Sequence, residues 1–175
     1  MAHIIEVKNL YKIFGSHPEK ALALLKEGKS KDEILDLTGQ GVGVADVSFH
    51  VEEGEILVIM GLSGSGKSTL VRCLNRLIEP SYGEILIDGT DVTRLNKEDL
   101  RILRQTRFGM VFQHFALFPR RTVIKNVEYG LEIQKVDPKK RQERALAALE
   151  QVGLKGWENS YPSQLSGGMQ QRVGL

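Results

Sequence analysis

The sequence predicts an α/β fold, because strand-like and helix-like segments alternate along the chain. Two observations carry this prediction. The apolar run at residues 56–60 ends at Gly61, as expected for a strand that is buried on both faces of a parallel sheet. The segment that follows repeats its apolar residues on one helical face until Pro80.

The first part of the chain predicts two strands separated by a helical insert. Residues 4–7 and 44–51 have the apolar patterning of strands. Between them, residues 18–38 predict two short helices, the second of which begins with the capping-box spacing Ser30 to Glu33. We expect this helical insert to span about residues 16–42, with glycines loosening the backbone before the second strand.

The remaining elements are short. Residues 84–88 and 110–112 predict strands, and a helix that begins at Asn96 lies between them. Asp88 precedes Gly89 and is interpreted as a hairpin-turn residue. Residues 122–134 predict a helix, and Asp137-Pro138 starts another. Both helices lie within the region of about residues 114–170 that we expect to be helical.

Composition excludes several classes of protein. The 175 residues carry 24 Lys and Arg against 22 Asp and Glu, and a net charge of +2 is too mild to indicate a nucleic-acid partner. The single Cys73 excludes an internal disulfide and is expected to be inert packing. Apolar runs are too short to span a bilayer and no signal-peptide pattern opens the chain, so we expect a cytoplasmic protein. No metal site is expected from the unpaired spacing of the histidines, which are His3, His17, His50 and His114.

Residues 61–68 match the phosphate-binding pattern G-x-x-x-x-G-K-[ST] in full. Glycines let backbone N–H groups face a polyphosphate, Lys67 supplies a cation for the β- and γ-phosphates, and the Ser68 hydroxyl can ligate Mg²⁺. A dinucleotide loop is excluded because the third glycine is missing. The predicted nucleotide-binding residues here are Gly61, Leu62, Ser63, Gly64, Ser65, Gly66, Lys67, Ser68 and Thr69.

A second glycine cluster lies at residues 165–173. Ser166 is placed to cap a polar helix, and Gly167 and Gly168 free the backbone at its start. Alone, such a string is more often a tight turn than a ligand site.

Together, the two strings resemble the phosphate loop and signature motif of ATP-binding-cassette (ABC) ATPases. The resemblance implies a P-loop NTPase-type fold with an antiparallel β subdomain and a helical subdomain. It implies ATP and Mg²⁺ as ligands, with Ser166, Gly167 and Gly168 closing on ATP held by a second copy. Gln113 would be the family's Q-loop glutamine, a catalytic residue that touches Mg²⁺ and the attacking water. Phe14 would stack on adenine, with Tyr11 as the alternative.

Within this family, the insert and the strings at residues 59–69 and 75–80 look most like the ATPase subunits of glycine betaine/proline importers. That likeness implies ATP-driven import of quaternary-amine osmoprotectants. The implied partners are a second copy, membrane-spanning permease subunits that dock near residues 115–121 and, indirectly, a substrate-binding protein. The implied location is the cytoplasmic face of the inner membrane, peripherally bound.

The resemblance also places a Mg²⁺-linked Asp and a catalytic Glu after the signature helix, beyond Leu175. We therefore expect a truncated ATPase domain that itself hydrolyses ATP only feebly or not at all. Two alternatives stay open, a soluble P-loop kinase and a non-enzymatic nucleotide-binding fragment.

Overall fold

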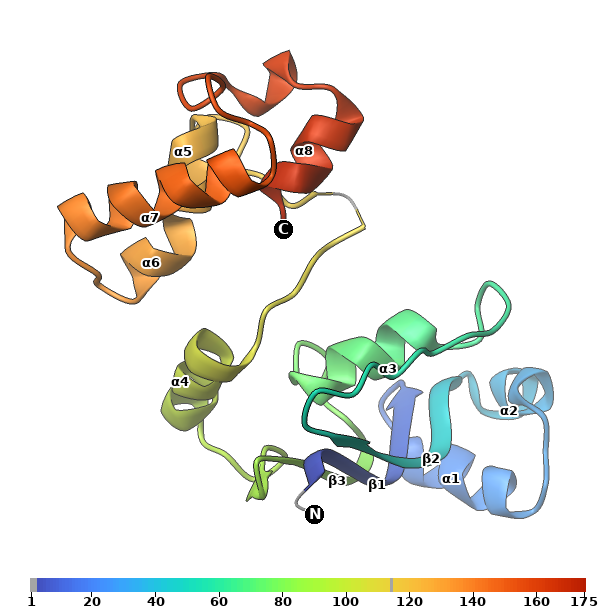
Figure 1. Ribbon diagram of the computed structural model, residues 1–175. Helices are drawn as coiled ribbons and strands as arrows, with labels where there is room; N and C mark the ends of the chain where they lie inside the picture. The colour runs from blue at the N-terminus through green and yellow to red at the C-terminus, as the bar shows by residue number, and fades with distance from the viewer. Residues whose placement is uncertain (1–2, 114) are drawn as a thin grey trace. The chain divides into compact units, whose positions relative to one another are not determined.

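The computed structural model describes residues 3–113 and 115–175, and the chain divides into two compact units, one up to Leu100 and the other from Arg101 to Leu175 (Figure 1). His114 lies outside the described residues. The first unit combines a β-sheet with helices, and the second is helical. The predicted α/β class is confirmed.

The first unit is built on an antiparallel sheet. Its strands are β1 (His3–Phe14), β2 (Gly41–Glu52), β3 (Tyr82–Ile87) and β4 (Thr90–Asp91), in the order β2-β1-β3-β4. Val7 on the central strand β1 pairs with Phe49 of β2 on one side and Ile85 of β3 on the other. Asp88 and Gly89 join β3 to β4 with φ angles of 48° and 74°, the backbone of a two-residue hairpin turn, as predicted.

The helical insert between β1 and β2 consists of α1 (Pro18–Lys26) and α2 (Lys31–Thr38). The predicted capping box is present at Ser30, whose hydroxyl accepts the Glu33 N–H while the Glu33 carboxylate accepts the Ser30 N–H. Ile34 and Ala21 pack with Ile13 of β1 in one buried cluster. The prediction that glycines loosen the backbone before the second strand is wrong in one respect. Residues 41 and 42 already pair with β1 as part of β2.

Two predicted strands are absent from the described residues. Residues 56–60 form no regular element, and Ile56 and Met60 are 87% and 85% exposed. Residues 110–112 are likewise irregular, and Val111 is exposed. A strand is completed by backbone hydrogen bonds to a neighbour. None of the four described strands pairs with either segment, so apolar composition alone does not make them strands.

The helix after the phosphate loop, α3 (Lys67–Leu74), is shorter than predicted. It stops because Arg76 takes the left-handed conformation, with φ 52°. The Arg76 guanidinium then donates to the carbonyl oxygens of Val92 and Leu95, at 2.8 and 2.9 Å. This contact ties the end of α3 to the segment after β4.

Helix α4 (Lys97–Arg107) begins in the first unit, and the second unit contains the remaining helices. These are α5 (Val123–Val127), α6 (Tyr129–Ile133), α7 (Pro138–Gln151), the 3₁₀ turn η1 (Pro162–Gln164) and α8 (Gly167–Val173). The single helix predicted at residues 122–134 is divided into α5 and α6 at the buried Glu128, whose carboxylate pairs with Lys125 at 2.8 Å. Asp137 caps α7 as predicted, accepting the backbone N–H groups of Lys139 and Lys140.

A second hydrophobic core holds these helices together. Val123 and Ile124 of α5 pack there with Ala145 and Leu149 of α7 and Val173 of α8. In the part of the chain that the structure describes, no helix is both long enough and apolar enough to cross a membrane.

In the first unit, Cys73 on α3 is buried, and its burial can be tested. The thiol is fully buried, and burial raises its pKa from 9.0 to about 11. At about pH 8 the folded protein should therefore react with a disulfide reagent about 100-fold more slowly than the same protein in guanidinium, where the thiolate is more populated.

The same shift has a consequence for stability. Above pH 9.0 the unfolded state loses the Cys73 proton first, so this residue's contribution to stability falls as the pH rises towards about 11. In the reagent experiment, equal rates of reaction of Cys73 in the folded protein and in guanidinium would contradict the burial of this thiol.

Candidate functional site

The phosphate loop leads directly into α3, and Gly66 is the residue before the first turn of that helix. Gly66 has φ 97°, a left-handed conformation that side chains rarely adopt. A Cβ at this position would also collide with the carbonyl oxygen of Gly43 on β2. The loop can therefore lie against β2 only with glycine at position 66.

Lys67, the first residue of α3, folds its side chain back over the loop. Its Nζ donates to the carbonyl oxygens of Gly61 and Leu62, at 2.8 and 2.7 Å. A turn in which the Ser65 N–H donates to the Leu62 carbonyl, at 3.2 Å, brings these groups together. The loop thus holds the Lys67 ammonium against its own carbonyl groups. An anionic oxygen would be a stronger acceptor for this ammonium than a neutral carbonyl.

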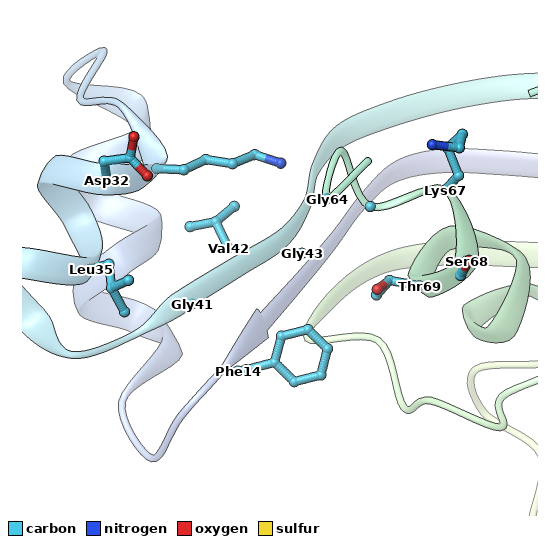
Figure 2. Close-up of a pocket in the computed structure, with 12 residues that line it drawn as sticks. Phe14, Asp32, Leu35, Gly41, Val42, Gly43, Gly64, Lys67, Ser68 and Thr69 are labelled. Carbon is cyan, nitrogen blue, oxygen red and sulfur yellow. The ribbon is translucent and has the colours of Figure 1, made fainter. Parts of the chain in front are cut away.

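A cavity of about 460 Å³ lies beside the loop, within the usual size range of small-molecule sites. Figure 2 shows that its walls come from β1, α2, β2 and the start of α3. Six of the residues predicted from sequence to bind nucleotide line it, namely Phe14, Gly64, Gly66, Lys67, Ser68 and Thr69. The structure therefore brings the predicted aromatic and the predicted phosphate loop to one cavity.

Phe14 lies at the end of β1 and is 44% exposed. The Lys12 ammonium lies 4.9 Å from the ring centroid. Gly43 makes room for the ring, since a Cβ there would lie 2.7 Å from Phe14 Cε2. Tyr11, the alternative aromatic, instead packs edge-on against Tyr82 with centroids 6.5 Å apart. The cavity wall thus contains Phe14, and of the two aromatics Phe14 is placed to stack on a flat ligand.

The rest of the loop borders a second cavity of about 280 Å³, lined in part by Gly61, Ser65, Gly66 and Lys67. Among the described residues, Leu62 and Ser63 are in the wall of neither cavity. Leu62 is 86% exposed at the loop tip.

Three residues of α2 line the larger cavity and were missed by the sequence analysis: Lys31, Asp32 and Leu35. One signal could have found this wall. Ile34 and Leu35 are adjacent apolar residues, and neighbours on a helix project about 100° apart, so one can lie in the core while the other lies at its edge. Ile34 is buried, whereas Leu35 is 50% exposed at the cavity.

The other predicted site residues lie in the second unit. Gln113 is exposed in a turn after the irregular residues 110–112. Ser166 caps α8 as predicted, since its hydroxyl accepts the Met169 N–H at 3.3 Å. Gly167 and Gly168 are exposed at the start of that helix, while Met169 packs against the second core. The functional roles of these residues remain predictions.

Comparison with known proteins shows the family of the chain. A family model described as "ABC transporter" matches residues 44–175. The glycine betaine/proline betaine transport system ATP-binding protein of Escherichia coli K12 is 55% identical over the whole chain, which covers 44% of that protein. The glycine betaine/carnitine transport ATP-binding protein of Listeria monocytogenes is 60% identical over 98% of the chain and 43% of its own length. The chain thus spans less than half the length of these curated relatives.

A solved structure has the same fold. It is a dimeric ATP-binding cassette in a post-hydrolysis state with ADP and phosphate, 32% identical, with a TM-score of 0.78. The match covers 97% of this chain and 66% of that one.

The collision at Gly66 gives a first prediction for this site. In the full-length protein, Gly66→Ala should weaken ATP binding at least tenfold, because the new Cβ pushes the loop away from β2. Isothermal titration with ATP measures this. Gly54→Ala is the matched control, since Gly54 also has a positive φ but has open space around it and lies outside the loop. Unchanged affinity in Gly66→Ala would contradict the described loop geometry.

The wall supplied by α2 gives a second prediction. Lys31→Ala removes a cation from the cavity and should weaken ATP binding about two- to fivefold, less so at high salt. The same titration with Lys26→Ala, on the neighbouring helix α1 and outside the cavity wall, should match the unsubstituted protein. If the two variants bind ATP equally well, Lys31 takes no part in binding.

Proposed function

The chain belongs to the ABC transporter family, and from this premise we propose that the full-length protein binds and hydrolyses ATP to power import of quaternary-amine osmoprotectants such as glycine betaine, or of proline. One observation supports the nucleotide: the Lys67-bearing loop and Phe14 face the same cavity of about 460 Å³. The solute class is supported by the 55–60% identity to glycine betaine transport ATP-binding proteins over nearly the whole chain.

The proposal assigns a role to Phe14, Lys67 and Thr69. Phe14 offers a partly exposed ring for stacking on adenine. Lys67 exchanges its two carbonyl acceptors for phosphate oxygens, and the first N–H groups of α3 add their dipoles. Thr69, in the cavity wall between these two ends, contacts the nucleotide.

The proposal includes Mg²⁺. Ser68, which lines the cavity, carries a hydroxyl, and the exposed Gln113 of the second unit carries an amide oxygen; both are the hard oxygen ligands that Mg²⁺ prefers. When bound, the ion neutralises charge that develops on the phosphate oxygens. Gln113 orients the attacking water in the proposed reaction.

We infer a nucleotide-binding domain that works as a pair. Two copies assemble head to tail, so that residues 61–68 of one face Ser166, Gly167 and Gly168 of the other. This pairing is supported by the exposure of both glycines at the start of α8 and by the dimeric cassette of the same fold. The insert at about residues 16–42 then belongs to the nucleotide side, and the helical subdomain at about residues 114–170 carries the signature.

Residues 115–121 are the proposed contact with the permease subunits at the cytoplasmic face of the membrane. Phe118 is 39% exposed and packs edge-on against Tyr129, with centroids 4.5 Å apart. The Arg121 guanidinium lies over both rings, at 5.2 and 5.1 Å, and pairs with Glu132 at 2.8 Å. This ordered aromatic and cationic surface suits the docking of another protein. A substrate-binding protein would engage the permease on the other side.

A soluble kinase would also use the phosphate loop. It leaves the capped glycine cluster at Ser166 and the position of Gln113 without a role, so the transport ATPase is the better account.

Lys67 provides the test. In the full-length subunit assembled with its permease, Lys67→Ala should lower ATP-driven uptake of radiolabelled glycine betaine by at least about a hundredfold, because the cation that faces the phosphates is lost. Lys20→Ala, an exposed lysine on α1, is the control and should transport normally. Persistent uptake in the Lys67 variant would refute the assignment, and uptake of other solutes alone would refute the solute class.

A further inference from the structure

His3, His50 and Glu52 form a cluster on the sheet that the proposed function does not use. One ligand atom from each residue lies within 4.8 Å of the others. His3 Nδ1 lies 2.7 Å from Glu52 Oε1, and the two imidazole rings have centroids 4.2 Å apart. We propose that these three side chains bind a divalent transition-metal ion of the Zn²⁺ type.

Strand geometry places two of the ligands. His50 and Glu52 are two residues apart on β2, so both side chains leave the same face of the sheet. Val51, between them, points to the opposite face and is buried. A pair of ligands at this spacing needs a third from the adjacent strand to enclose an ion.

An irregularity in β1 supplies that third ligand. Ile5 pairs with Val51, but His3 pairs with Glu52, so two steps along β1 match one step along β2. Regular pairing would put His3 on the same face as Ile5 and Val51. The shift, a β-bulge at Ile4, turns His3 to the face of His50 and Glu52. Bulges commonly re-aim a side chain in this way at functional positions.

The donor atoms suit a metal ion of intermediate hardness, such as Zn²⁺. Two imidazoles and one carboxylate form a three-ligand site that leaves a coordination position for water. Metal bonds of about 2.0–2.2 Å put ligand atoms roughly 3.3–3.6 Å apart around a tetrahedral ion. Separations of up to 4.8 Å would close by little more than about 1 Å, and the 2.7 Å between His3 Nδ1 and Glu52 Oε1 would open by about 0.6–0.9 Å, at side chains that are partly exposed. Glu6, which lies opposite His50, is already paired with Lys8 at 3.1 Å.

The proposed site is remote from the nucleotide cavity. Phe14 and Gly41 pair at one end of β1 and β2, and His3 and Glu52 pair at the other. The two ends are separated by about 35 Å of strand. A bound ion would therefore clip the first strand to the second, and the proposal does not depend on ATP binding.

The test uses the full-length protein, without an affinity tag of histidines and stripped of metal. Isothermal titration with Zn²⁺, and the visible absorption of the Co²⁺ form, should show one more bound ion than the His3→Ala/His50→Ala double variant. Each of His50→Ala and Glu52→Gln alone should weaken binding at that site at least tenfold. His17→Ala is the matched control, because His17 is also an exposed histidine 3.2 Å from a carboxylate, that of Glu19, but belongs to no three-ligand cluster among the residues that the structure describes.

Circular dichroism on each variant separates lost ligation from lost folding. Equal stoichiometry in the unsubstituted protein and the double variant would overturn the proposal. So would a loss of binding in His17→Ala that matches the loss in His50→Ala.

Discussion

The architecture of the site depends on the close approach of Gly66 to the Gly43 carbonyl. This contact, which leaves no room for a Cβ, sets the first turn of α3 against β2. Because β2 is paired with β1 along its whole length, the same contact fixes the loop relative to Phe14 at the end of β1. The residues of the first unit that line the cavity therefore share one rigid support, although they come from three separate parts of the chain.

Features determined within a few residues could be predicted from the sequence. The caps at Ser30, Asp137 and Ser166 and the Asp88-Gly89 turn depend only on local backbone and side-chain chemistry, and all are present. The strands expected at residues 56–60 and 110–112 are not formed. A run of apolar residues favours burial, but a strand also needs a neighbouring strand to bond its backbone groups, and composition does not predict that neighbour.

The candidate site likewise has parts that could be predicted from the sequence and parts that could not. The phosphate loop is contiguous, so its pattern could be recognised directly. The wall from α2 is contributed by residues about 30 positions before the loop, and only the packing of Ile34 turns Leu35 towards the cavity. The preference for Phe14 over Tyr11 rests on the family resemblance, and the structure adds only that Phe14 lines the cavity while Tyr11 packs against Tyr82. The spacing of His3 and His50 along the chain does not reveal their proximity, because it arises from the cross-strand register of β1 and β2.

The bonds from Lys67 to the Gly61 and Leu62 carbonyls also bear on the thermodynamics of ligand capture. An incoming anion competes with these carbonyls for the same ammonium protons, so the binding free energy reflects an exchange of acceptors rather than a newly formed ion pair. The bonds that are given up nevertheless hold the loop in shape beforehand. Part of the ordering entropy is therefore already spent when the protein folds, before any ligand arrives.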